Sequence, residues 1–186
     1  DKIIIALKKV KPDEIYNLGD QSSVQASFYS PADAAQYSGL NALVLLEAVK
    51  ATDRTIRFYQ ASSSEMFGVS NVSPQNEATP FQPISPYGAS KLTAHLGVGN
   101  FRSAYGLHAS AGIMFNHESP LRSLEFVTRK ITYTLANITC GVETVLSLGN
   151  IEARRDFGYA GDYVEAMWAM LQQDLPDDYV IATGNS

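Results

Sequence analysis

Tyr87 and Lys91 form the residue pair whose types and spacing point most directly to chemistry. Residues four apart on a helix share one face, so the phenol and the ammonium are expected to lie together. A free tyrosine has a pKa of about 10, and a neighbouring cation lowers that pKa because it favours the phenolate. We therefore predict that Tyr87 takes a hydroxyl proton while hydride leaves the same carbon for a nicotinamide cofactor. A surface pair without function would show the same spacing.

A cluster of serine hydroxyls and one carboxylate, at residues 62–65, directly follows a predicted strand. If the end of that strand faces a substrate, a serine hydroxyl can donate a hydrogen bond to the reacting oxygen. Glu65 can then remove a carbon-bound proton, provided that the carboxylate is partly desolvated. Alternatively, the serines satisfy backbone groups of a loop and Glu65 is an ordinary solvated side chain.

Three basic residues, Lys130, Arg154 and Arg155, supply positive charge in the second half of the chain. Cations beside a cleft can hold a diphosphate, but a pair of arginines is also common in a solvated turn. For His95 and His108 we expect structural roles. No histidine or acid has the spacing of metal ligands, so no metal is predicted.

Composition argues against several classes of protein. The formal net charge is −5, and no basic stripe is available to neutralise the phosphates of a nucleic acid. No apolar run approaches the roughly 18 residues that would cross a membrane. Cys140 is the only cysteine, which excludes an intrachain disulfide and favours the cytoplasm. We expect its thiol to behave as a small buried apolar group.

Strand and helix patterns alternate along the chain, which predicts an α/β fold with a doubly wound parallel sheet covered on both faces. In such sheets ligands bind beyond the carboxyl ends of the strands, where polar loops are expected at 19–22, 62–65 and 116–119. Helices are predicted up to residue 10 and over 34–50, 87–105, 126–140 and 162–173, and strands over 14–18, 56–61, 107–115, 145–148 and 179–182.

The beginning of the chain predicts a piece of a longer protein. The chain does not begin with methionine, and residues 3–10 already have the pattern of the last turns of a helix. A cofactor fold of this type carries a glycine-rich phosphate loop after its first strand, and the sequence has none. We expect residues 1–186 to be a partial NAD(P)-binding catalytic domain with the start of the substrate-binding elements. The strand at 14–18 would then be an exposed edge.

Three segments carry a resemblance to a known family: 60–68 (QASSSEMFG), 85–91 (SPYGASK) and 115–120 (FNHESP). They are similar to those of the GDP-mannose 4,6-dehydratases, which are extended short-chain dehydrogenases/reductases. The similarity extends over nearly the whole chain. It implies a Rossmann-like fold, incomplete at its N-terminus. The Tyr-x-x-x-Lys pair indicates only the superfamily, whereas the Ser-Ser-Glu and Asn-His-Glu-Ser-Pro runs are far more specific.

The resemblance also implies a reaction, in which GDP-mannose becomes GDP-4-keto-6-deoxymannose. Tyr87 takes the proton of the sugar O4 while C4 gives hydride to NADP. The C4 ketone acidifies the C5 proton, which Glu65 removes; the C6 hydroxyl leaves as water and hydride returns to C6. The net reaction is a dehydration, catalysed by a lyase. Ser63 supplies a hydroxyl, and Lys91 holds the nicotinamide ribose and tunes Tyr87.

Further contacts and partners follow from the same resemblance. A homo-oligomer, either a dimer or a tetramer, is implied for the full-length protein. The implied cofactor-binding residues are Leu18, Gly19, Gln21, Ser22, Lys91, His117 and Arg122, and the implied substrate-binding residues are Asn116, Lys130 and Arg155.

Several positions depart from the family pattern. Asp20 replaces a small apolar residue beside the cofactor, and an acid there would repel a pyrophosphate. Ser23, Asp33 and Leu121 also differ from the residues that are usual at their positions. These changes put cofactor affinity in doubt more than the catalytic residues. Two alternatives therefore stay open: another nucleotide-sugar epimerase or dehydratase of the same fold, and an inactive, cofactor-free module.

Overall fold

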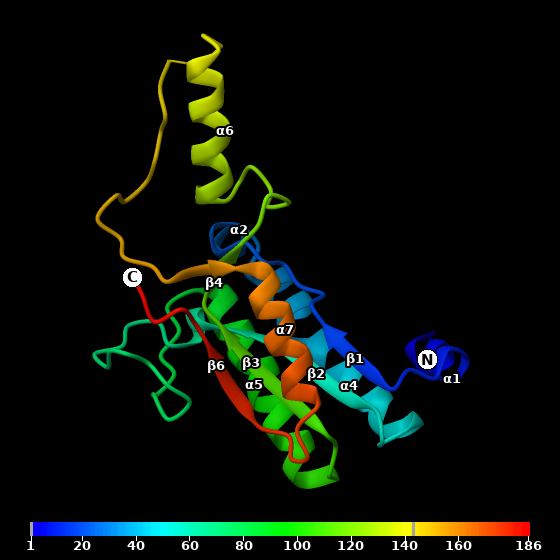
Figure 1. Cartoon of the computed structure of the whole chain (residues 1–186). Coiled ribbons are helices and arrows are strands. Elements are labelled where there is room, and N and C mark those ends of the chain that lie inside the picture. The colour runs from blue at the N-terminus through cyan, green and yellow to red at the C-terminus, as the bar shows by residue number, and fades with distance from the viewer. Residues whose placement is uncertain (1, 143) are drawn as a thin grey trace.

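The computed structural model describes residues 2–142 and 144–186 and has a four-stranded sheet at its centre (Figure 1). The strand order is β1-β2-β3-β6, and all three pairings are parallel. This confirms the predicted α/β fold with a parallel sheet. β1 is an edge strand, as expected. The strands are β1 Glu14–Asn17, β2 Arg57–Ser63, β3 Ala109–Met114 and β6 Asp178–Ile181.

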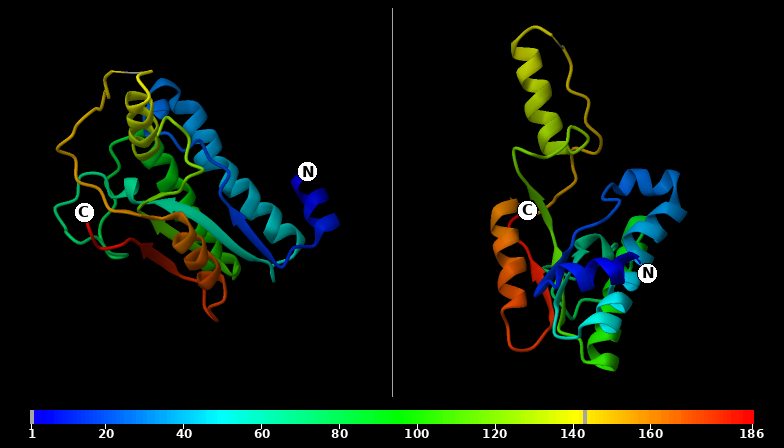
Figure 2. Two further views of the ribbon diagram at one scale, coloured as in Figure 1. Left: turned by 45° about the horizontal axis from the view of Figure 1, so that its top comes forward. Right: turned by 90° about the vertical axis from the view of Figure 1, so that its right-hand side faces the viewer.

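Helices cover both faces of this sheet (Figure 2). α1 (Lys2–Val10), α4 (Asn41–Thr52) and α5 (Pro86–Tyr105) lie on one face and share an apolar cluster with the strands. α7 (Ala160–Leu171) lies on the other face and packs through Met167 and Met170 against Tyr59. Because the inner strands are covered on both sides, β3 is buried at every position, which is typical of a central parallel strand.

Short helices precede α4 and surround the edge of the sheet. α2 (Val24–Tyr29) was not anticipated from the sequence. The predicted helix at 34–50 exists, but it is built from α3 (Pro31–Ala34), the π-helical turn η1 (Ala35–Leu40) and α4 in succession. A 3₁₀ turn, η2 (Ser64–Met66), directly follows β2.

The segment between β3 and α7 differs most from the prediction. β4 (Asn116–Glu118) pairs in parallel with β5 (Phe157–Tyr159) in a second, two-stranded sheet, so 116–118 is a strand rather than a loop. The strand predicted at 145–148 is absent from the described residues. α6 (Val127–Thr139) exists as predicted but projects away from the main sheet (Figures 1 and 2). The apolar run at 145–148 has no neighbouring strand among the described residues to pair with its backbone, which explains why the predicted strand does not form.

Cys140 is exposed at the end of α6, so the expectation of a buried thiol was wrong. Thr134 is the one buried residue of α6. The other residues of this helix are partly or fully exposed, because α6 does not pack on the sheet. An apolar position on a helix predicts burial only where another element covers that face.

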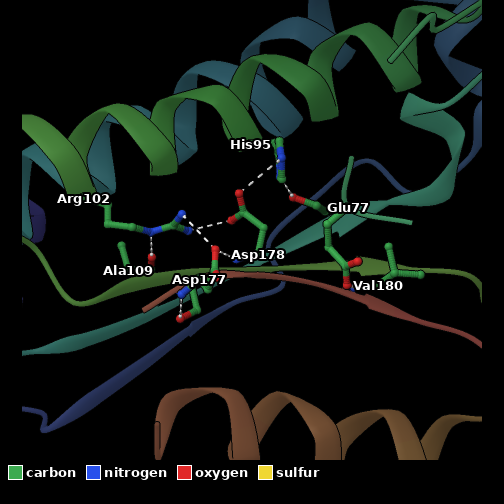
Figure 3. Close-up of polar contacts among 9 residues, drawn as sticks. Glu77, His95, Arg102, Ala109, Asp177, Asp178 and Val180 are labelled. Carbon is green, nitrogen blue, oxygen red and sulfur yellow. Dashed lines mark hydrogen bonds and ion pairs between the residues drawn. The ribbon is translucent and has the colours of Figure 1, made fainter. Parts of the chain in front are cut away.

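A charged cluster ties α5 to the edge strand β6 (Figure 3). Arg102 on α5 donates from Nη2 to Asp178 Oδ1 at 2.6 Å and from Nε to the Ala109 carbonyl at 2.8 Å. His95 lies two turns before Arg102 on the same face of α5, with Nε2 3.7 Å from Asp178 Oδ2 and Nδ1 3.1 Å from Ser62 Oγ. His95 therefore has the structural role that we expected, and the cluster fixes the helix that carries Tyr87 and Lys91.

We predict that Asp178→Ala lowers the free energy of unfolding by about 2 kcal/mol, because it leaves the largely buried Arg102 without its carboxylate. Asp177→Ala is the matched control. Its carboxylate lies 3.8 Å from the same guanidinium, but the side chain is 74% exposed, so the loss should stay below about 0.5 kcal/mol. Urea unfolding measures both values. Equal losses for the two variants would contradict the role given to Asp178.

Candidate active site

A cleft of about 550 Å³ lies at the carboxyl ends of β1, β2 and β3. All four predicted catalytic side chains line it, although they come from segments up to 28 positions apart in the chain. The predicted site residues on its wall are Leu18, Ser22, Ser63, Glu65, Tyr87, Lys91, Asn116, His117 and Arg122.

The first turn of α5 places Tyr87 in this cleft. Ser85 caps the helix by accepting a hydrogen bond from Gly88 N at 3.0 Å, and Pro86 occupies the first helical position. Tyr87 N donates to Ser27 Oγ of α2 at 3.1 Å. Gly88 lets the helix approach η2, since a Cβ at this position would lie 2.6 Å from the Glu65 carbonyl oxygen. Tyr87 is therefore held close to the Ser-Glu segment.

The end of β2 carries Ser63 and Glu65. Ser63 Oγ accepts a hydrogen bond from Glu65 N at 3.2 Å and so caps η2. The same hydroxyl lies close enough to the Tyr87 phenol to lower the pKa of the phenol. One serine thus fixes the turn that bears the carboxylate and contacts the phenol. This is the arrangement that the functional interpretation of the cluster requires.

Lys91 lies one turn after Tyr87 and is almost fully buried, with 4% of its side chain exposed. Its ammonium donates to the Ala61 carbonyl at 2.8 Å and forms an ion pair with Oδ2 of Asp20. The ammonium lies 5.6 Å from the centroid of the Tyr87 ring. Burial lowers the pKa of Lys91, and the Asp20 carboxylate opposes that shift.

The expected lowering of the Tyr87 pKa was wrong for this structure. Burial raises the pKa of Tyr87 well above its ordinary value, and the negative charges of Asp20 and Glu65 add to the shift. The Ser63 hydroxyl and the charge of Arg122 act in the opposite direction. Lys91 is paired with Asp20 and is not among the charges that shift the pKa of Tyr87. The sequence marked Asp20 as unusual but did not reveal this pair.

The other predicted binding residues are distributed over neighbouring cavities. Gly19 and Gln21 line a second cavity of about 720 Å³, which shares Asp20 with the main cleft. Arg155 lines a third, of about 370 Å³, which shares Glu65 and Asn116 with it. These cavities are adjacent, so a long ligand can extend from one into the next. Lys130 lies on the projecting helix α6 and lines none of the three.

Two residues after β3 have fixed positions on the wall of the cleft. The His117 ring stacks on Tyr163 of α7 with centroids 4.8 Å apart, and its Nδ1 lies 2.9 Å from the Phe115 carbonyl. Arg122 lies with Nε 3.2 Å from Glu118 Oε2, and its guanidinium stands 3.4 Å from the centroid of Phe126. These contacts orient both side chains before any ligand binds.

Of the other unusual positions, Ser23 lies on the wall of the main cleft, whereas Asp33 and Leu121 lie outside it. Ser23 caps α2 by accepting from Ala26 N at 3.1 Å. Asp33 is exposed on α3 and accepts from Ser30 Oγ at 2.6 Å, and Leu121 is 94% exposed. Within residues 2–142 and 144–186, no three histidine, cysteine or acidic side chains are placed to hold a metal ion. Over the same part of the chain, no helix is long and apolar enough to span a membrane.

The chain is similar to known proteins over its whole length. The family model described as GDP-mannose 4,6 dehydratase matches residues 1–186. GDP-mannose 4,6 dehydratase 1 of Arabidopsis thaliana is 58% identical over 184 residues, which are 97% of this chain and 51% of that protein. The human GDP-mannose 4,6 dehydratase is 53% identical over 184 residues, 98% of this chain and 50% of its own. The chain thus spans about half the length of the curated relatives that it matches.

Among solved structures, RMD from Pseudomonas aeruginosa complexed with NADPH superposes with a TM-score of 0.88 at 28% identity. The match covers 94% of this chain and 61% of the other. The fold is therefore shared with an extended short-chain dehydrogenase/reductase, and the sequence similarity extends from the first residue to the last. Because one family model spans all 186 residues, the chain belongs to the GDP-mannose 4,6-dehydratase family.

Proposed function

We propose that the protein carrying this chain converts GDP-mannose to GDP-4-keto-6-deoxymannose with the help of NADP. The observation that supports this most directly is the meeting of Ser63, Glu65, Tyr87 and Lys91 on one cleft in a chain of this family. Residues 1–186 form part of the catalytic domain in this proposal, and the relatives' names supply the substrate.

The cleft suits a nicotinamide cofactor. Asp20 Oδ1 is buried beside Lys91 and has no hydrogen-bond partner among the described residues, so a donor from a ligand would satisfy it. Leu18, Ser22, Lys91, His117 and Arg122 would line the bound cofactor, with Gly19 and Gln21 beside them in the adjoining cavity. When bound, the cofactor accepts hydride from the sugar and later returns it.

The chain's own residues carry the proton transfers. Tyr87 takes the proton of the sugar O4, and the Ser63 hydroxyl, which lies near the phenol, holds the same oxygen. Glu65 removes the proton from C5 once C4 is a ketone, because the ketone acidifies its neighbour. The electron pair of the C5–H bond forms a C5–C6 double bond, and the C6 hydroxyl takes the proton held by Glu65 and leaves as water. When hydride returns to C6, a proton from solvent adds to C5, and Tyr87 gives the O4 proton to solvent.

We propose that the nucleotide sugar is bound by Asn116, Arg155 and Lys130. Arg155 and Asn116 line the cavity next to Glu65, where a cation can pair with the diphosphate of the sugar nucleotide. Lys130 would contact the substrate only if α6 approached the cleft. We further propose a homodimer or homotetramer, for which the exposed Leu40 and Leu96 leave apolar surface. A cytoplasmic location fits the unpaired Cys140.

We predict that the full-length protein with NADP turns over GDP-mannose many times without net formation of NADPH. The reason is that hydride returns to the same sugar, so the cofactor ends unchanged. Product is measured by mass spectrometry as a loss of one water, and NADPH by absorbance. One NADPH formed per product would refute the dehydratase proposal in favour of a simple dehydrogenase. Replacing NADP with NAD in the same assay tests the cofactor preference.

A further inference from the structure

Asp20 is a residue of the cleft to which the family gives no role, because a small apolar residue is usual at its position. Its side chain is 7% exposed, and it lies between the main cleft and the adjoining cavity lined by Gly19 and Gln21. A carboxylate this deeply buried needs partners for both oxygens. The structure supplies a partner to only one of them.

Oδ2 of Asp20 is paired with the Lys91 ammonium. Oδ1 is buried and accepts no hydrogen bond from residues 2–142 or 144–186. Leaving such an oxygen unsatisfied is costly, and buried polar groups in proteins almost always have a partner. A donor from a ligand that enters the cleft would satisfy this oxygen.

The charges around Asp20 restrict what that donor can be. A phosphate would be repelled by the carboxylate, so the diphosphate of a ligand cannot lie here. A cation would compete with Lys91, whose ammonium already neutralises Oδ2. A neutral hydroxyl group fits both conditions. Lys91 uses two of its three N–H groups on Asp20 and the Ala61 carbonyl, which leaves one to donate to a second, adjacent hydroxyl.

We propose that Asp20 adds an acceptor to the ribose contact that the family resemblance implies for Lys91, so that Asp20 Oδ1 accepts from one hydroxyl of a vicinal diol while Lys91 donates to the other. This inference rests on the proposed function, because it names the ligand group bound in the same cleft. Both the ribose of a nicotinamide nucleotide and the hexose of a nucleotide sugar carry such a diol. Asp20 is in this view a binding residue and not a source of repulsion.

The test is a binding measurement without turnover on the full-length protein and its Asp20→Ala and Asp20→Asn variants. We expect Asp20→Ala to weaken NADPH binding about tenfold or more, as removal of a hydrogen bond to a charged group usually does. Asp20→Asn keeps an accepting oxygen and should lose less. Asp53→Asn, a change at a fully exposed carboxylate, is the control and should bind NADPH as the unaltered protein does.

Smaller probes identify the diol. Reduced nicotinamide mononucleotide carries the ribose, and N-benzyl-1,4-dihydronicotinamide lacks it. A loss in Asp20→Ala for the first probe but not the second assigns the ribose. A loss for GDP-mannose alone assigns the hexose instead. The proposal is overturned if Asp20→Ala, still folded by circular dichroism, binds all of these ligands as tightly as the unaltered protein or more tightly.

Failure of the inference and failure of the proposed function give different results. A protein whose NADPH affinity depends on Asp20 but which forms no 4-keto-6-deoxy product would refute the dehydratase function and leave the diol site intact. A protein that dehydrates GDP-mannose equally well with alanine at position 20, and with unchanged affinities, would refute the diol site alone.

Discussion

Glu65→Gln abolishes formation of the 4-keto-6-deoxy sugar while oxidation at C4 persists. The two steps separate because different residues carry them: Tyr87 takes the O4 proton, whereas Glu65 takes the C5 proton. A glutamine at 65 keeps the size of the side chain and an accepting oxygen, but its amide cannot act as a base at neutral pH. Glu65 lines both the main cleft and the cavity of Arg155, so the substituted side chain still contacts the substrate.

The measurement for Glu65→Gln has two readouts. Reduction of the quenched reaction with borodeuteride should trap a hexose labelled at C4, and incubation in D₂O should place no deuterium at C5. Glu77→Gln is the matched control, since Glu77 Oε1 only accepts a hydrogen bond from Val180 N at 2.7 Å and a glutamine oxygen can do the same. A sugar epimerase of this fold would keep its activity in Glu65→Gln, so unchanged turnover would favour that alternative.

The sequence was sufficient for the parts of the fold that rest on long, periodic segments. The parallel order of β1, β2 and β3, and the helix α5 with its start at Pro86, follow from apolar runs and helix-start signals. The approach of Tyr87 to Ser63 also followed, because Ser63 ends β2 and a helix that leads from one parallel strand to the next begins at the edge of the sheet where the first strand ends. Local pattern and tertiary contact agree at these positions.

The errors share a physical origin, which is dependence on contacts distant in sequence. Strands β4 and β5 have three residues each and exist because they pair with each other across a long segment. The exposure of Cys140 depends on α6 leaving the sheet, which no local pattern reveals. Likewise, the effect of Lys91 on Tyr87 was predicted without the ion pair between Lys91 and Asp20. Asp20 precedes Lys91 by 71 positions, and no spacing rule links the two residues.

The second large effect is expected for Tyr87→Phe, which should lower kcat about 100- to 10,000-fold, the usual contribution of a general base. The ring and its packing are retained, so the loss reflects the hydroxyl alone. Tyr105→Phe on the same helix is the control. Its ring, over which Lys50 Nζ stands 4.2 Å from the centroid, is kept, and Tyr105 lies outside the cleft, so kcat should not change.

The pH dependence gives Tyr87→Phe a sharper test than the rate alone. Burial and the nearby Asp20 raise the pKa of Tyr87, which favours the protonated phenol. The base form is gained only as pH rises, so kcat of the unaltered protein should increase toward alkaline pH, and this increase should vanish in Tyr87→Phe. A profile that keeps the same alkaline rise in Tyr87→Phe would place the essential base elsewhere. Ser63 caps the turn at residues 64–66 and Glu65 already takes the C5 proton, so Lys91, whose pKa burial lowers, would then be the remaining candidate among the four catalytic residues.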